Sequence, residues 1–497
     1  MSWYSLTEGQ EWGDDFAEYI MQAQSITEKN PTGFIEKNRF TIETSTHTVG
    51  PVAYPWGYPM LLAPLYYLFG MNLLAFKSLN IICYLFFLLS LWWGCRTSHS
   101  SIERMILVSL FAMHPYFMEF MDNVVSDIPF LLFSTITIFF MGRIVIQKKT
   151  LISNFTDQLL LGLLIAISFF IRTQGILILA TLGATQLILV MQHITARKTT
   201  ATESIMESRH QLFPISRNRL VSLLIIISPY LFFFILVLIW QTFLPEGGTS
   251  HTSEMKRISL ESIKHNLLFY NKLPAEFFTG FYSKITLILY GASLPLFIIG
   301  LFKRRNSDYH IIIYGALYIV LMIGWPYTQG FRYLLPVIPF YVSFVLTGMV
   351  SFADTRDRSL NLFWRIGSTC VVIAIIAVSW NTSFKNVTTS GGHEQIKKIG
   401  PYYSTAQDLF TFIKSHTEED SIVIFFKPRL MRLFTNRQSI MIENIDKVTK
   451  GDYLCFQKIY DNNNQIEKND LDSLLKNEAI QLIYQNVDFQ LYRIMRQ

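Results

Sequence analysis

The chain has 497 residues, of which 51% are hydrophobic, 15% aromatic and only 16% charged. A soluble protein usually has about a quarter of its residues charged, so this composition excludes an ordinary soluble protein and indicates several membrane spans. The net charge of +6 does not call for a nucleic-acid partner, because basic cytoplasmic loops account for it and no basic stripe interleaved with aromatics is present.

The N-terminal region is polar and contains two adjacent carboxylates. Residues 12–19 (WGDDFAEY) place Asp14 and Asp15 at the start of an amphipathic helix. The sequence Asn30-Pro31-Thr32-Gly33 is typical of a turn. Residues 57–70 are apolar but short and contain two prolines, which predicts an interfacial or re-entrant helix rather than a span.

Apolar runs after residue 73 predict about ten transmembrane helices. The predicted spans are 74–94, 105–120, 128–146, 158–171, 175–193, 220–244, 284–302, 310–327, 333–350 and 366–381. Basic residues gather in alternate loops, and the positive-inside rule makes that face cytoplasmic. Residues 1–73, the loop 245–283 and the C-terminal tail then lie on the outer face. Residues 1–50 contain no apolar signal segment, so we expect that a preceding helix is missing, with a reverse-anchor first span as the alternative.

From about residue 382 the composition becomes polar and mixed. This change predicts two domains: a membrane domain at 1–381, with the outer loops 1–73 and 245–283, and an outer-face α/β domain at 382–497. Helices are expected at 404–416 and near 469–478, with strands at 421–426, 439–442, 452–457, 480–485 and 488–494. The predicted fold class is a mainly α polytopic membrane protein with a small C-terminal soluble α/β domain.

Three ionisable residues beside spans are candidates for a site on the outer face, because charges at membrane depth are costly. Asp127 follows Ser126 at the start of a span, where capping of the helix is the alternative role. Arg172 stands before Thr173-Gln174-Gly175, and an arginine reaching out to the membrane interface is its alternative. Arg332 lies in Gly330-Phe331-Arg332-Tyr333 and can bind a phosphate through two N–H groups.

Together with Asp14, these residues offer a carboxylate base for an attacking hydroxyl, a second carboxylate, and two arginines for a phosphate leaving group. We place Asp14 and Asp127 in the catalytic set. Adjacent acids on a helix diverge by roughly 100°, which argues against Asp14 and Asp15 sharing one divalent cation. We therefore expect no cofactor, with a divalent metal ion as the alternative.

Several motifs, in this order and spacing, resemble those of the GT-C membrane glycosyltransferases. They are WGDDFAEYIMQAQ, YPWGYPMLLAPLYYLFG, SDIPFLLF, the Arg172-Thr173-Gln174-Gly175 turn and FRYLLPVIPF. Within this group the chain is most similar to the protein O-mannosyltransferases and the lipid A aminoarabinose transferase. The resemblance implies that Asp14 is the catalytic base, with Asp15 where many members have Glu. It also implies that Arg172 is the basic residue lining the lipid-phosphate pocket, that Asp127 is the Asp at the start of a span in the family, and that Arg332 is the family's late arginine.

The resulting hypothesis is an inverting glycosyltransferase at the outer face of a bacterial inner membrane. The donor is a sugar linked to polyprenyl phosphate, and the acceptor is a lipid, a polysaccharide or a protein. The expected substrate-binding residues all lie in these motifs. They are Asp15, Tyr54, Trp56, Tyr58, Arg172, Gln174, Arg332 and Tyr333. The alternatives are a transporter or flippase of lipid-linked sugars, a non-catalytic scaffold, and another GT-C activity such as oligosaccharide or polymer transfer.

Overall fold

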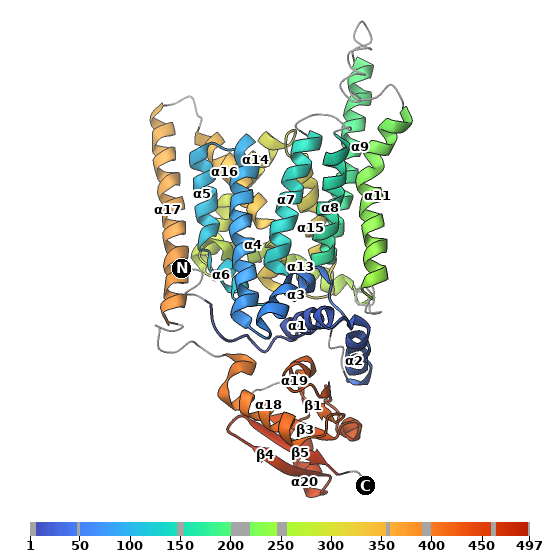
Figure 1. The fold of residues 1–497 in the computed structure, drawn as a ribbon. Helices are drawn as coiled ribbons and strands as arrows, with labels where there is room; N and C mark the ends of the chain where they lie inside the picture. Colours follow the sequence, from blue (N-terminus) through green and yellow to red (C-terminus); the bar gives the residue numbers. More distant parts are fainter. Residues whose placement is uncertain are drawn as a thin grey trace.

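The computed structural model describes residues 6–46, 50–146, 154–199, 219–245, 256–353, 358–389, 399–458 and 464–495. The basic loops used to predict orientation fall partly outside these ranges, at 147–153, 200–218 and 354–357, and so does part of the predicted outer loop, at 246–255. Figure 1 shows a helical bundle, with α1, α2 and a small α/β domain together at one end.

The N-terminal and membrane regions are helical throughout. Their helices are α1 Asp14–Thr27, α2 Pro31–Thr44, α3 Gly57–Phe69, α4 Leu73–Gly94, α5 Ser101–Ala112, α6 Pro115–Met121, α7 Asp127–Met141, α8 Phe155–Ile171, α9 Ile176–Thr199, α11 Arg219–Phe243, α13 Leu260–Lys272, α14 Lys284–Arg304, α15 Tyr309–Gly324, α16 Ile338–Ala353 and α17 Arg358–Thr389. Each predicted span overlaps at least one of these helices.

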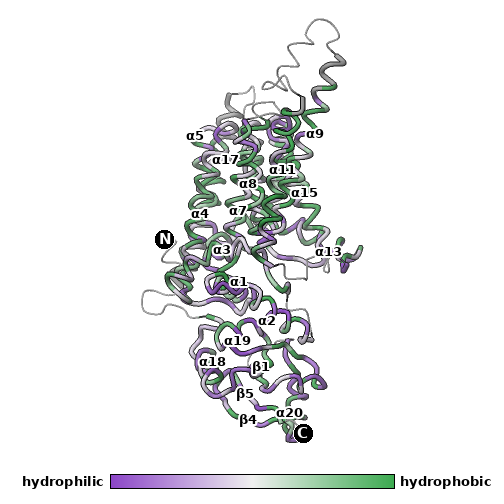
Figure 2. Tube along the Cα trace, turned by 45° about the vertical axis from the view of Figure 1, so that its right-hand side comes forward, coloured by the Kyte–Doolittle hydropathy of each residue, from purple (hydrophilic) through white to green (hydrophobic). Residues whose placement is uncertain are grey.

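Six helical segments in the described residues are long and apolar enough to cross a membrane. They are Leu73–Thr97, Asp127–Ile146, Thr173–Gln192, Leu223–Phe243, Lys284–Arg304 and Ile366–Lys385, and shorter apolar helices occupy Phe155–Ile171, Tyr309–Gly324 and Ile338–Phe352. The bundle is accordingly the hydrophobic part of the chain, while the domain below it alternates between polar and apolar residues (Figure 2). These features confirm the predicted polytopic fold class.

Two local predictions were wrong, both because of proline. The predicted span 105–120 is two helices, since Pro115 lacks an N–H and begins α6 as its first residue, after His114. The predicted turn at Asn30-Pro31 is instead the start of α2, where the Asn30 side chain accepts a hydrogen bond from the Gly33 N–H at 3.0 Å. α3 agrees with the expected short helix: its 13 residues extend about 20 Å, less than a bilayer core.

The C-terminal domain contains one mixed sheet of five strands. Its elements are α18 Ser404–His416, β1 Ile422–Ile424, α19 Pro428–Thr435, β2 Gln438–Ile440, β3 Tyr453–Gln457, α20 Lys468–Lys476, β4 Ile480–Gln485 and β5 Phe489–Ile494. The strand order is β2-β1-β3-β5-β4, parallel from β2 to β3 and antiparallel from β3 to β4. All five predicted strands and both predicted helices are present, whereas α19 was not predicted.

The unpredicted helix α19 joins this domain to α1. Arg429 Nη1 lies 2.6 Å from Glu18 Oε2, and both side chains are almost fully buried, at 1% and 0% exposed. Arg429 Nη2 also donates to the Pro51 carbonyl at 2.6 Å. Gly50 has a φ of +100°, and a β-carbon there would come 3.1 Å from Arg429 Nη1, so glycine is required both for the backbone and for the arginine.

Loss of one partner of this ion pair should destabilise the protein strongly. Replacing Arg429 with methionine leaves the buried Glu18 without a counter-charge, which typically costs about 3–5 kcal/mol. The double variant Glu18→Leu/Arg429→Met should recover most of that loss, because the Glu18 carboxylate is removed together with its counter-charge. The measurement is thermal unfolding of the detergent-purified chain.

The matched control is Arg493→Gln. Arg493 Nη2 lies 3.7 Å from Glu418 Oε1, and both side chains are more than half exposed, so its loss should leave the unfolding midpoint unchanged. Equal midpoints for the Arg429 and Arg493 variants would contradict the importance of the buried pair.

Candidate functional site

Asp15 lies at the first turn of α1 and faces the membrane bundle. Its Oδ1 accepts a hydrogen bond from the Tyr54 hydroxyl at 2.6 Å, and its Oδ2 lies 3.4 Å from Arg332 Nη1. Tyr54 is itself held on α1, because Gln22 Nε2 donates to its carbonyl at 2.9 Å and its N–H donates to Gln22 Oε1 at 3.2 Å. The carboxylate of Asp15 is therefore fixed in orientation, with 34% of the side chain exposed.

Asp14 faces the C-terminal domain. The positive charges of Arg429 and Lys427 lie near its carboxyl group, and its Oδ1 is enclosed without a hydrogen-bond partner among the described residues. Burial raises the pKa of Asp14 above its ordinary value, and the two cations oppose that rise. The two adjacent acids thus serve different neighbours, as expected from their divergence along a helix.

Asp127 is the first residue of α7 and receives both predicted arginines. Arg332 donates from Nε to Oδ1 at 3.2 Å and from Nη2 to Oδ2 at 3.0 Å, and Arg172 Nη1 also donates to Oδ1. The capping position before α7 is occupied by Ser126. The Asp127 carboxylate is therefore not the cap, and it binds the two arginines. Only 1% of the Asp127 side chain is exposed, and this pairing is what makes the buried charge tolerable.

Arg332 is the centre of the cluster, since it contacts both Asp127 and Asp15. Its partner Arg172 donates from Nε to Gln174 Oε1 at 3.2 Å. The Tyr19 and Ser126 hydroxyls lie 2.9 Å apart and connect α1 with the start of α7. The two carboxylates and the two guanidinium groups balance in charge.

The predicted aromatic residues divide into two groups. Tyr54 belongs to the cluster through Asp15, and Tyr333 is the buried neighbour of Arg332. Trp56 and Tyr58 instead face other partners: the Trp56 indole donates to the Pro245 carbonyl at 3.1 Å, and the buried Tyr58 hydroxyl donates to Asn80 Oδ1 at 3.3 Å. The structure therefore brings Asp15, Tyr54, Asp127, Arg172, Gln174 and Arg332 together. Tyr58 adjoins this group through Tyr19, with ring centres 5.0 Å apart, whereas Trp56 packs against Phe34.

The membrane bundle contains a mostly apolar cavity of about 450 Å³. It runs between α13, α14, α15 and α16, and Leu334, two residues after Arg332, lies on its wall. Other residues along its walls are Tyr270, Phe297, Ile319, Val337 and Phe344. The mostly apolar wall of this cavity thus reaches Leu334, two residues from Arg332 in the chain.

Sequence reasoning missed the contribution of the C-terminal domain to this region. Lys427 and Arg429 approach Asp14 from the start of α19. Two local signals for that helix are present, namely Pro428 at its first position and Asn436 in the left-handed conformation after its end, at φ 59°. Neither signal shows which partner the helix contacts.

Metal binding has no support in the described parts of the chain, where no group of three or more His, Cys, Asp or Glu side chains is close enough to hold an ion. The expectation of no cofactor stays a prediction.

Comparisons with known proteins identify the fold. No protein-family model matches the chain, and no curated protein sequence matches it either. It is similar in structure to ArnT from Cupriavidus metallidurans bound to undecaprenyl phosphate, with 11% identity and a TM-score of 0.57 over 99% of this chain and 95% of that one. It is also similar to the oligosaccharyltransferase AglB from Archaeoglobus fulgidus in complex with an inhibitory peptide and a dolichol-phosphate. That match has 11% identity and a TM-score of 0.51, over 91% of this chain and 66% of the other. Both are GT-C membrane glycosyltransferases, so the chain has the GT-C fold that its motifs predict.

Gly57 provides a test of how the site is assembled. A β-carbon at this first residue of α3 would come 2.5 Å from the Phe170 carbonyl group, just before Arg172. Gly57→Ala should therefore displace α3 or α8 and destabilise the protein by about 1–3 kcal/mol, as overpacking usually does. The measurement is the thermal unfolding midpoint, with Gly291→Ala in α14 as control, because nothing lies within 4 Å of a β-carbon there. Equal midpoints for the two variants would contradict a tight α3–α8 contact.

Proposed function

We propose that this chain is an inverting glycosyltransferase that moves a sugar from a polyprenyl-phosphate donor to an acceptor at the outer face of the membrane. The observation that carries the proposal is the position of Arg332, which contacts a buried carboxylate, Asp127, and a more exposed one, Asp15. Arginine beside an apolar cavity suits a phosphate that bears a hydrocarbon chain, and the carboxylate suits a general base.

The lipid part of the donor is assigned to the cavity between α13 and α16. Leu334 on its wall follows Arg332 by two residues, so a chain in the cavity would place its phosphate near the guanidinium groups. The similar structures support this class of donor, since ArnT was solved with undecaprenyl phosphate and AglB with a dolichol-phosphate.

The donor phosphate would enter at the contact between Arg332 and Asp15. This contact is 3.4 Å long and partly exposed, whereas the contacts of Arg332 with Asp127 are shorter and buried on the Asp127 side. A ligand oxyanion can replace the weaker contact while Asp127 keeps the guanidinium in place. Arg332 and Arg172 then neutralise the charge that develops on the leaving phosphate.

In the transfer step, Asp15 accepts the proton of an acceptor hydroxyl or amine. The acceptor atom forms a bond to the anomeric carbon as the bond from that carbon to the phosphate oxygen breaks, with inversion. The phosphate leaves with the bonding electrons as a polyprenyl phosphate, and the proton stays on the carboxylate. One base and direct displacement require no covalent intermediate.

We favour Asp15 over Asp14 as the base because of what each faces. Asp15 is partly exposed and 3.4 Å from the arginine that would hold the leaving group. Asp14 faces Arg429 and Lys427 of the outer domain, and its Oδ1 is enclosed. The role that the resemblance implies for Asp14 remains a second hypothesis that the same variants test.

Transfer itself is tested with polyprenyl phosphate bearing a radiolabelled sugar, in membranes that contain the chain and native acceptors. We expect the label to move to a lipid, polysaccharide or protein fraction while polyprenyl phosphate is released. The control is Arg332→Gln, which should abolish the release. A labelled donor that crosses the membrane with its glycosyl–phosphate bond intact would contradict transfer and favour a flippase.

Exchange of each acid for its amide identifies the base. Removal of a general base typically lowers the rate by about 10²–10⁴-fold, and we expect this loss for Asp15→Asn, with donor binding retained. Asp14→Asn is the matched control one residue away and should keep most of the transfer rate. The reverse order would assign the base to Asp14, and full activity in both variants would refute a carboxylate base on α1.

A further inference from the structure

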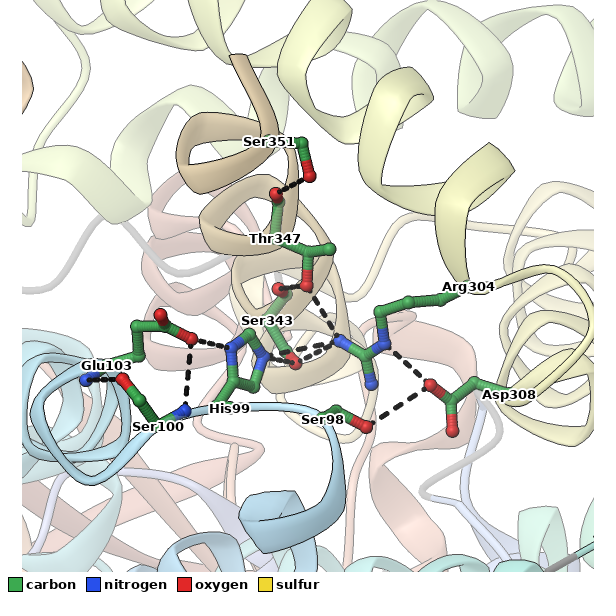
Figure 3. Close-up of polar contacts among 9 residues, drawn as sticks. All are labelled: Ser98, His99, Ser100, Glu103, Arg304, Asp308, Ser343, Thr347 and Ser351. Atoms are coloured by element: carbon green, nitrogen blue, oxygen red, sulfur yellow. Dashed lines mark hydrogen bonds and ion pairs between the residues drawn. The ribbon is translucent and has the colours of Figure 1, made fainter. Parts of the chain in front are cut away.

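A second polar site lies at the other end of the bundle, away from α1. A cavity of about 570 Å³ opens where α4, α5, α14 and α16 end or begin. Most of its lining side chains are polar: Thr97, Ser98, His99, Ser100, Glu103, Lys303, Arg304, Ser307, Asp308, Thr347 and Ser351. Figure 3 shows the contacts that several of these residues make with one another. α14 has 21 residues and separates the two ends by about 30 Å, so this cavity is distinct from the Arg332 cluster.

Arg304 is the most constrained charge in the cavity wall, with 6% of the residue exposed. Its Nε donates to Asp308 Oδ2 at 2.6 Å, and its Nη1 donates to the Ser343 hydroxyl at 2.8 Å and to the Thr347 hydroxyl at 3.2 Å. The guanidinium also lies 4.7 Å from the centre of the Phe344 ring. Its orientation is therefore fixed before any ligand binds.

His99 also contacts Arg304 and helps to fix its orientation. Its Nδ1 lies 3.0 Å from Glu103 Oε2, and its Nε2 lies 3.3 Å from Arg304 Nη1. Because arginine only donates, Nε2 is the acceptor and Nδ1 carries the proton, which makes the imidazole neutral. Burial, and then the charge of Arg304, lower the pKa of His99, in agreement with this neutral form.

Two cationic side chains at this cavity, Arg304 and Lys303, have N–H groups that make no hydrogen bond with the described residues. Arg304 Nη2 makes no hydrogen bond with any residue that the structure describes, and Figure 3 shows it with no dashed line. The next cation, Lys303, is exposed and also has no partner in the described chain. The two carboxylates are engaged: Asp308 with Arg304, and Glu103 with His99 and the Ser100 N–H.

We propose that this cavity binds the phosphate group of an anionic ligand. A fixed guanidinium with a free Nη2 group, a neighbouring ammonium and several hydroxyls suit a phosphate with several acceptor oxygens. The cavity lies at the ends of the spans, at the depth of lipid head groups, on the face predicted to be cytoplasmic. The phosphate can therefore belong to a phospholipid or to a soluble compound. The proposal does not depend on the glycosyl-transfer function.

The test uses the full chain and two probes. Inorganic phosphate is titrated into the detergent-purified protein, with the shift in unfolding midpoint as readout. Separately, phosphatidic acid retained after transfer into phosphatidylcholine nanodiscs is quantified by mass spectrometry. Saturable binding of phosphate indicates a soluble ligand, and retention of phosphatidic acid alone indicates a head group; either result supports the proposal.

Variants assign the binding to the cavity. Lys303→Gln changes an exposed side chain and should fold normally, yet it should weaken binding about tenfold, the usual loss for one charge-assisted contact. Arg304→Lys keeps the charge but loses the planar fork, and it should weaken binding at least as much. Arg305→Gln is the matched control, because Arg305 is the next cation but does not line the cavity and donates to the Phe302 carbonyl.

Two outcomes would overturn the proposal. One is the absence of saturable binding of both probes by the wild-type chain. The other is an equal loss of binding in Arg305→Gln and Lys303→Gln, which would mean that general surface charge attracts the anion and that the cavity does not.

Discussion

The buried ion pair between Glu18 and Arg429 is the interaction on which the arrangement of the outer region depends. It joins α1, which carries both acids, to a helix more than four hundred residues later in the chain. Two charges at this depth are stable only with one another, so the C-terminal domain and α1 hold each other in a single relative position. Since Tyr54 is tied to α1 through Gln22 and donates to Asp15, that position also determines where the exposed carboxylate stands relative to Arg332. The outer domain thus acts on the site through α1.

The charged cluster has a rigid part and a replaceable part. Asp127 is buried and satisfies both arginines, and this mutual pairing lets the charges persist beside an apolar bundle. Asp15 is held from the other side by Tyr54 and makes only a long contact with Arg332. A site that keeps its cations in place and has one weak contact is preorganised for an anion, because little rearrangement opposes binding.

Hydropathy was sufficient to predict the spans, the polytopic class and the five strands, because these patterns are local. The order of the predicted spans also placed Asp127, Arg172 and Arg332 on the same face of the membrane, because it determines which loops lie on each side. The sequence could not decide between Asp14 and Asp15: neighbours on a helix differ by roughly 100°, and only the packing of α1 against α3 and α19 sets which acid faces Arg332. The surroundings of Trp56 and Tyr58 could not be predicted for the same reason, since their hydrogen-bond partners Pro245 and Asn80 are distant in sequence. Pro115 is a sequence signal for the break between α5 and α6. The continuous apolar pattern on both sides of it nevertheless led to the prediction of a single span.

The two polar ends of the bundle use the same means to orient an arginine. Asp127 binds Arg332 at Nε and Nη2, and Asp308 binds Arg304 at Nε. In each case a carboxylate engages one edge of the guanidinium and compensates for its desolvation, so another N–H group remains directed elsewhere with its position fixed. At the Arg332 end the remaining group, Nη1, reaches a second carboxylate that is partly exposed. At the Arg304 end Nη1 is taken by hydroxyls and Nη2 remains. In the proposed function, a phosphate bound to Arg332 would therefore lie beside Asp15, the proposed base, whereas a phosphate bound to Arg304 would lie beside hydroxyls and Lys303.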